Sequence, residues 1–319
     1  MSTILVNSEV SDERRREELF SGRLFFYTPR KPVQALRDHA WDLICEAFAP
    51  IDPMMAQEHF PVEDFAARSG PLKTRFTHSQ RTKELLRDLL ADYGCDMELT
   101  YFDLARLRIV THSGYLTAGV GYAYGAHRDV WYSAPPCQVN WWFPLVEIGN
   151  HSALAFHPQY WEQPVPNTSH AFDAYEWNAN GRANAAKFIT SDERNHPTNS
   201  TPIPLEPQDR IVGAPSSMLI FSAAQLHSTV PNTSARTRFS IDFRTASLRD
   251  LRAHRGANLV DTYSTGTTLR DFLRASDFSP LPDDVIAEYD KGSKYQGPLV
   301  YEPDLTGIGV NIHTKPESV

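Results

Sequence analysis

The chain of 319 residues is 41% hydrophobic and 11% aromatic, which is enough to build one large core or two small ones. It carries 31 basic and 39 acidic residues, a net charge of −8, and has no long basic run. This charge argues against a nucleic-acid backbone or an anionic membrane surface as its partner, and no apolar stretch approaches the ~18 residues of a membrane span.

The amino terminus and the cysteines favour a cytoplasmic protein. The first residues turn charged after a short apolar patch, unlike a secretory signal. Cys45, Cys95 and Cys137 are odd in number and form no CxxC pair. We therefore expect reduced thiols rather than a disulfide frame or a zinc ribbon.

The first hundred residues predict a short strand and two helices. No repeat, low-complexity tract or linker divides the sequence, so we expect a single domain over residues 1–319, with a polar lead-in over about 1–20. A strand is predicted at "GRLFFYTP" (22–29). Helices are predicted at 31–50, where Pro32 suits the first turn, and at 79–94, which begins with a Ser cap and stops at Gly94.

From residue 98 the sequence changes to a two-residue period, which is typical of strands. Strands are predicted at 98–110, 137–145, 152–158, 217–223 and 237–245. A long polar segment over 160–205 is expected to be a lid, because connections of that length in a compact domain are usually functional. Short helices at 268–276 and 282–290 predict a helical extension over 246–319. The fold class expected is α+β, with a mainly antiparallel sheet folded as a sandwich or barrel.

One short motif suggests metal chemistry. On a strand, His127 and Asp129 would point to the same face, because residues i and i+2 share a side. An imidazole and a carboxylate are two of the three ligands of the 2-His-1-carboxylate arrangement that holds non-haem Fe(II). By itself the motif is weak, and a histidine paired with an acid at a strand edge is the commoner explanation.

Residues further along the chain make the motif more specific. His227 ends a predicted strand and could be the third ligand. Arg238 follows it on the next strand and could bind a carboxylate through both guanidinium nitrogens, with Ser240 on the same face. The combination of H-x-D, a distant His and R-x-S is far more specific than any of its parts.

Two other motifs in the sequence lack residues that their function requires. "HRD" also occurs in the catalytic loop of protein kinases, but the Asn required five residues after the Asp is replaced by Ala134. "GVGYAYG" (119–125) resembles a dinucleotide loop, but its last glycine is misplaced and no helix follows.

With these residues in view, the chain resembles the Fe(II)/2-oxoglutarate-dependent dioxygenases, particularly the phytanoyl-CoA-hydroxylase-like branch. The resemblance covers roughly residues 98–245 and rests on "HRD", "VNWWFPL", "SALAFHPQYW" and "LHSTVPNTSARTRFS". It implies a double-stranded β-helix (a jelly-roll, cupin-like core) flanked by helices. By position it implies that His127, Asp129 and His227 are the catalytic iron ligands, and that Arg238, assisted by Ser240, binds the distal carboxylate of 2-oxoglutarate. "FHPQYW" departs from the Pro-Gly-Ser-His more usual in the family, so substrate identity does not transfer.

The resemblance also implies an activity. Fe(II), 2-oxoglutarate and O2 would together hydroxylate, desaturate or cyclise a small molecule, with release of succinate and CO2. An amino acid derivative or a secondary-metabolite intermediate is the expected substrate. Asp129 argues against halogenation, because halogenases of the superfamily carry a small residue there. Two alternatives stay open: a cupin-like metal oxygenase or isomerase that does not use 2-oxoglutarate, and a catalytically silent jelly-roll binding protein.

Several other residues are candidates with a plainer alternative. Gln138, Asn140 and Trp142 share a strand face and could contact 2-oxoglutarate, although both Trp141 and Trp142 could equally be core aromatics. Further residues could contact substrate but could also form structural ion pairs or aromatic packing: Arg106, Arg108, Tyr124, Trp131 and Tyr160.

Overall fold

The computed structural model of the chain describes residues 2–121, 123–181, 188, 191–192, 194–258 and 261–300. Parts of two predicted segments lie outside the described residues, namely 182–187, 189–190 and 193 of the expected lid and 259–260 and 301–319 of the expected extension. Within the described residues, no helix is both long enough and apolar enough to cross a membrane.

The larger of two sheets has eight strands: β1 (Ile4–Val6), β2 (Leu24–Tyr27), β3 (Thr100–Phe102), β4 (Arg106–Val110), β5 (Val139–Pro144), β8 (Met218–Ser222), β10 (Arg238–Ser247) and β11 (Leu273–Arg274). Their order is β1-β2-β8-β5-β10-β3-β11, and β4 also pairs with β10. The β1–β2 pair is parallel, and the other pairs named here are antiparallel.

The smaller sheet is formed by β6 (Leu154–Phe156), β7 (Asp209–Ile211) and β9 (His227–Thr229), in the order β7-β6-β9. An antiparallel bridge between His127 and His227 adds the chain before β5 to its edge. Both pairs within this sheet are also antiparallel.

The order in which the chain visits the two sheets defines the core architecture. Starting at β4, it crosses to the His127 bridge, returns to β5, passes through β6 and β7 of the smaller sheet, and then changes sheet at each step through β8, β9 and β10. The resulting orders β4-β10-β5-β8 and bridge-β9-β6-β7 are those of a double-stranded β-helix, or jelly roll. The predicted fold class is therefore confirmed.

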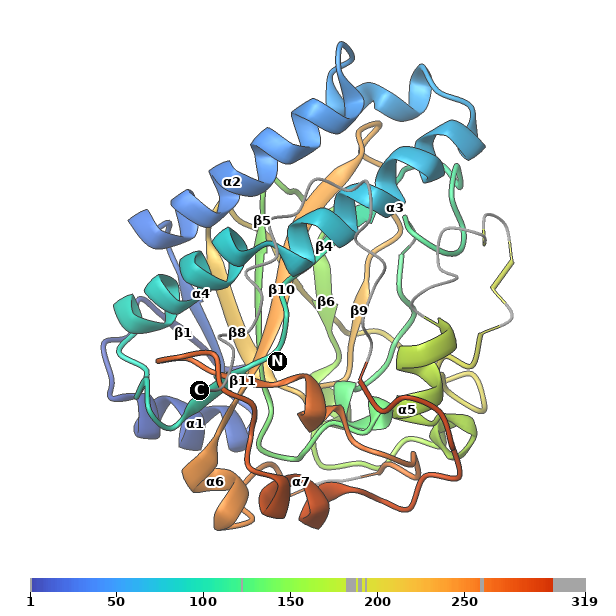
Figure 1. The fold of residues 1–319 in the computed structure, drawn as a ribbon. Helices are drawn as coiled ribbons and strands as arrows, with labels where there is room; N and C mark the ends of the chain where they lie inside the picture. The colour runs from blue at the N-terminus through green and yellow to red at the C-terminus, as the bar shows by residue number, and fades with distance from the viewer. Residues whose placement is uncertain are drawn as a thin grey trace.

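Three helices cover the outer face of the larger sheet: α2 (Lys31–Phe48), α3 (Val62–His78) and α4 (Gln80–Asp92) (Figure 1). Their apolar residues pack with the helix-facing side chains of the sheet in one buried cluster. Ser79 caps α4 by accepting from the Thr82 N–H, as predicted, and Gly94 adopts a positive φ of 68° just beyond its end.

Strand β10 shows how one sequence pattern serves two sides. Phe239, Ile241 and Phe243 are fully buried in the helix-side cluster. The alternate residues include Arg238, Asp242 and Arg244, which line a cavity between the sheets and α3. The period of two thus separates core from site.

Residues 2–20, expected as a polar lead-in, form a strand and a helix that pack into the fold. Strand β1 extends the larger sheet, and helix α1 (Asp12–Phe20) buries Leu19 completely. Arg16 is also buried, with its Nε 2.5 Å from Asp250. The polar composition of this segment hides buried ion pairs, which hydrophobic patterning cannot detect.

Two further differences concern strand ends. The strand predicted over 98–110 is split into β3 and β4 at Asp103, whose carboxylate accepts from the Arg244 backbone N–H at 2.6 Å. After β10 the chain forms α6 (Leu248–Arg252) and α7 (Asp283–Tyr289). The helix expected at 268–276 is instead a 3-10 turn, Thr268–Asp271, followed by β11, because pairing with β3 holds the chain extended.

Candidate metal centre

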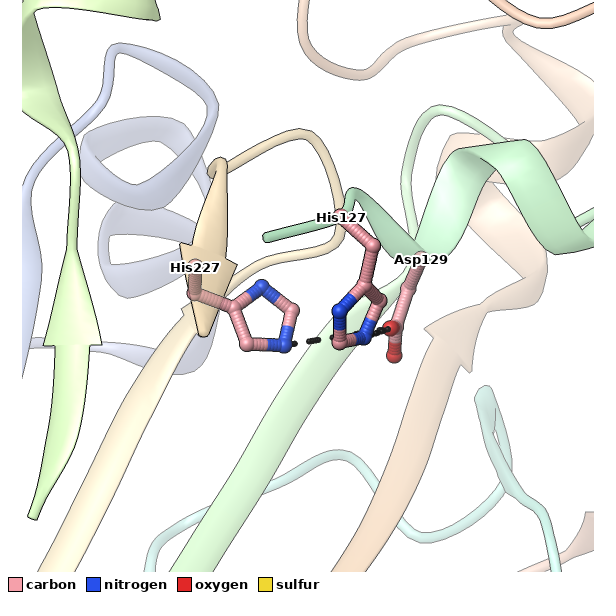
Figure 2. A group of neighbouring side chains, drawn as sticks. All are labelled: His127, Asp129 and His227. Carbon is pink, nitrogen blue, oxygen red and sulfur yellow. Dashed lines mark ion pairs between the residues drawn. The ribbon is translucent and has the colours of Figure 1, made fainter. Parts of the chain in front are cut away.

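The three predicted ligands meet at the open end of the smaller sheet. His227 Nε2 and His127 Nε2 lie 4.0 and 3.5 Å from Asp129 Oδ1, and one ligand atom from each residue falls within 4.8 Å of the others. Figure 2 shows the two rings and the carboxylate turned toward a shared space. A metal ion bound at ~2.1 Å by each ligand would require these donor atoms to move closer together.

Hydrogen bonds on the far side of each imidazole orient it for metal binding. His127 Nδ1 lies 2.8 Å from the Gly125 carbonyl, and His227 Nδ1 lies 3.0 Å from the Gln225 carbonyl. A carbonyl can only accept, so each Nδ1 carries a proton, and Nε2 is the nitrogen that each ring turns toward the shared space. Burial, reinforced by His127, lowers the pKa of His227 to about 3, which keeps this ring neutral.

The carboxylate is also held on two sides. While Asp129 Oδ1 faces the histidines, Oδ2 accepts from Nε and Nη2 of Arg244, both at 3.3 Å. Burial acts to raise the pKa of Asp129, but Arg244 and His127 outweigh it and hold the pKa well below its usual range. The site therefore presents two imidazole nitrogens and one charged oxygen, a donor set suited to Fe(II).

The local structure around the motif differs from the predicted strand. His127 makes only an isolated bridge, and Asp129 begins a 3-10 turn that ends at Tyr132. Arg128 nevertheless keeps extended dihedrals, φ −114° and ψ 141°. His127 and Asp129 therefore still share a face, as predicted, although no sheet continues through them.

The Arg128 side chain points to the side opposite the metal ligands and anchors the backbone of this segment there. This side chain is completely buried, donates to the carbonyls of Ala224, Tyr160 and Gln163, and lies 3.2 Å from Asp261. Trp131 Nε1 donates to the same Asp261 at 2.7 Å. The hydrogen bonds of Arg128 and the contacts of Asp261 thus fix the segment that carries two of the ligands.

A cavity of about 500 Å³ opens beside the three ligands and is bounded by α3, β4, β5 and β10. Gln138, Asn140 and Trp142 line it, as predicted from their common strand face, and the Gln138 amide donates to Asn140 at 3.0 Å. Trp141 packs mainly on the other side, stacked on Phe243 in the helix-side core.

Arg238 and Ser240 supply donors that the protein itself does not use. Arg238 lines the cavity and is 4% exposed, and its Nη1 donates to the Ser152 carbonyl at 2.8 Å. Its Nε and the Ser240 hydroxyl are buried without a hydrogen-bond partner. Burial and the nearby Arg108 lower the pKa of Arg238 to about 10, and no carboxylate among the described residues pairs with it. Such a site calls for an anionic ligand.

The residues predicted to contact substrate fall into two groups. Arg106, Arg108 and Tyr124 line the cavity, but Arg106 pairs with Asp103, and Arg108 binds Asp242 through two nitrogens. These arginines are thus held in ion pairs within the wall.

Trp131 and Tyr160 are not on the cavity wall. Trp131 is completely buried and bonded to Asp261, while the Tyr160 hydroxyl donates to the Pro204 carbonyl at 2.8 Å. Packing beneath the metal segment directs both side chains away from the cavity.

The structure adds cavity residues that sequence reasoning missed. Lys73 comes from α3, whose relation to the strands only the fold reveals. From the predicted lid segment come Trp177 and His196, whose rings lie 4.6 Å apart. Arg244 could have been noticed, because it shares a face with Arg238 on β10.

Comparisons with known proteins give only distant similarities. No protein-family model and no curated protein matches this chain. Similar solved structures include the epimerase SnoN in complex with Fe3+, alpha ketoglutarate and nogalamycin RO, at 14% identity over 74% of this chain and 85% of that chain, with a TM-score of 0.39. EvdO2 from Micromonospora carbonacea var. aurantiaca complexed with 2-oxoglutarate matches at 15% identity over 75% and 92%, with a TM-score of 0.40. EctD from S. alaskensis with bound Fe matches at 13% over 77% and 83%, with a TM-score of 0.37. At such values the likeness assigns no activity to this chain.

Proposed function

We propose that this chain is an Fe(II)- and 2-oxoglutarate-dependent oxygenase of a small molecule, within the phytanoyl-CoA-hydroxylase-like branch. The observation that carries the proposal is the pairing of two features in one cavity. Two imidazole nitrogens and a carboxylate converge in it, and a buried guanidinium without a carboxylate partner among the described residues lines the same cavity. The first feature suits iron and the second suits a dicarboxylate.

Each residue has a defined task in this proposal. His127, Asp129 and His227 would hold iron, which when bound supplies the site for O2 reduction coupled to decarboxylation of the keto acid. Arg244 keeps Asp129 charged and fixed in orientation. Arg238 would bind the distal carboxylate of 2-oxoglutarate.

The surrounding residues shape the site for both ligands. The Ser240 hydroxyl would assist Arg238, while Gln138 and Asn140 offer amide groups on the neighbouring strand. The Trp142 ring lies 5.8 Å from the Arg238 guanidinium and limits its motion. Asp129 occupies the position that a halide ligand would need, so we propose hydroxylation, desaturation or cyclisation rather than halogenation.

The lid expected over residues 160–205 and the single domain expected over residues 1–319 remain part of the proposal. Trp177 and His196 of segment 160–205 reach the cavity, which supports a role for this segment in covering bound substrate. Excluding water there would protect the reactive stage of the reaction from side reactions.

The Arg238 assignment can be tested by binding. In Arg238→Ala, we expect 2-oxoglutarate to bind at least ~30-fold more weakly while Fe(II) affinity changes little, because only the carboxylate partner is removed. Calorimetry with each ligand in turn measures the two affinities. Equal loss of both would contradict the assignment.

Turnover separates the proposal from its two rivals. We expect O2 consumption to require both Fe(II) and 2-oxoglutarate, and succinate to be released. Oxygen consumption without the keto acid would favour the cupin-like oxygenase, and neither metal binding nor oxygen consumption would favour a silent binding protein.

A further inference from the structure

The balance of charge in the cavity is the starting point. Among the described residues, six basic side chains line it: Lys73, Arg106, Arg108, Arg194, Arg238 and Arg244. Three lining carboxylates, Asp103, Asp129 and Asp242, and the neighbouring Asp192 offset four of these charges. Fe(II) and 2-oxoglutarate carry opposite charges of equal size, so binding both leaves the excess of two positive charges unchanged. A neutral substrate would leave this excess in the cavity without a compensating charge.

Lys73 is the basic residue in the cavity besides Arg238 that pairs with no carboxylate among the described residues. Its Nζ donates to the Val120 carbonyl, which uses one of three donors. Burial, with repulsion from Arg108 and Arg194 and partial relief from Asp242, lowers the pKa of Lys73 to about 7. The side chain therefore faces a space dominated by positive charge.

Contacts connect this basic end of the cavity to the metal ligands. The Tyr124 ring lies 6.0 Å from the His127 ring, and its hydroxyl lies 3.1 Å from Arg108 Nη1. The charge of Arg108 in turn acts on Lys73. A ligand held at Lys73 would thus extend past Tyr124 toward the metal centre.

A run of aromatic rings that begins at a metal ligand lines the same cavity. From His127 it passes through Tyr132, Phe172 and Trp177 to His196, with successive ring centroids 5.7, 5.1, 5.8 and 4.6 Å apart. Such a surface accepts a planar or apolar body rather than a strongly hydrated one.

We propose that the substrate is an organic oxyanion, a carboxylate or a phosphate ester with an apolar or unsaturated body, and that Lys73 binds its anionic end while the aromatic run contacts its body. This inference rests on the proposed function, since it places the reacting carbon beside the iron ligands. It also explains the role of α3, whose residues from Gly70 to His78 form one wall of the cavity.

The test uses matched probes on the full chain under anaerobic conditions with Fe(II) and 2-oxoglutarate present. The probes are phenylalkanoic acids of graded chain length, their neutral amides, and phenylalkyl phosphates. Calorimetry gives their affinities for wild type, for Lys73→Met, and for Lys31→Met as a control at an exposed lysine outside the cavity. The absorption band of iron-bound 2-oxoglutarate is recorded in the same samples.

We expect the best acid or phosphate to bind at least tenfold tighter than its neutral counterpart in wild type and Lys31→Met, and this preference to disappear in Lys73→Met. The ratio of acids to phosphates identifies the oxyanion. Equal binding of the neutral probes, an unchanged preference in Lys73→Met, or no binding of any anion overturns the inference. Loss of the absorption band with the anion preference intact would instead overturn the proposed function alone.

Discussion

At the scale of single residues, Arg128, the middle residue of the H-R-D triplet, matters to the site as much as the two ligands beside it. Arg128 and Asp261 are both buried and lie 3.2 Å apart, so each compensates the charge of the other. Trp131 and the Val165 N–H complete the hydrogen bonds of Asp261. The metal segment thus depends on an ion pair that contacts no metal ligand directly.

Removing Arg128 should destabilise the protein strongly. Arg128→Met leaves the Asp261 charge buried without its cation, and we expect a loss of about 3–5 kcal/mol in the free energy of unfolding. Arg252→Met breaks an exposed ion pair with Asp284 and should cost less than about 1 kcal/mol. Urea unfolding of both variants measures the difference, and similar small losses would contradict the role given to Arg128.

Lys73 predicts a specific pH dependence of stability. Its pKa is about 7 in the folded chain and ordinarily 10.5, so below pH 7 the lysine is charged in both states and its burial destabilises the fold. Between pH 7 and 10.5 the unfolded chain binds more protons, so this destabilisation fades as pH rises. We expect Lys73→Met to exceed wild type in stability most at pH 6 and progressively less toward pH 10. A difference that stays constant with pH in urea titrations would refute this.

At the scale of elements, helix α1 shows what a polar composition can hide. Leu19 is fully buried in the helix-side core, while Glu17 on the same helix is exposed. Strand β1 precedes α1 in the sequence and β2 follows it, and the two strands pair with each other. Both ends of the helix are therefore attached to the larger sheet.

A pair of substitutions tests whether α1 is part of the core. Leu19→Ala should lower the free energy of unfolding by about 2–5 kcal/mol, because the cavity it leaves lies against packed side chains. Glu17→Ala should change it by less than about 0.5 kcal/mol. Thermal and urea unfolding give both values. No effect of Leu19→Ala would show that residues 2–20 are a detached lead-in after all.

At the scale of the whole molecule, most of the features that the sequence predicted are strands and helices in which apolar residues recur with a regular period. The alternation along β10 and β5 placed Arg238, Gln138 and Asn140 on the cavity side, the spacing of apolar residues placed α2, and a Ser cap and a terminal glycine placed α4. The convergence of His127, Asp129 and His227 followed from the resemblance. The jelly roll then brings them together through a bridge rather than a strand.

The features that could not be predicted depend on contacts between distant segments. Lys73 enters the cavity only because α3 packs beside β4, and Arg128 is anchored by an aspartate 133 positions later in the chain. The direction of Trp131 follows from the same aspartate. No local pattern records such pairings, because either partner alone looks like an ordinary surface or core residue.

In the proposed function, iron and 2-oxoglutarate bind together at the three ligands. The most direct test is an anaerobic titration of the chain with Fe(II) and 2-oxoglutarate, following the weak visible absorption band of a keto acid chelated to iron. We expect a band that appears only when both Fe(II) and 2-oxoglutarate are added and that is lost or altered in Asp129→Ala. Iron binding without any band on adding 2-oxoglutarate would contradict the co-substrate, and an unchanged band in Asp129→Ala would contradict the site.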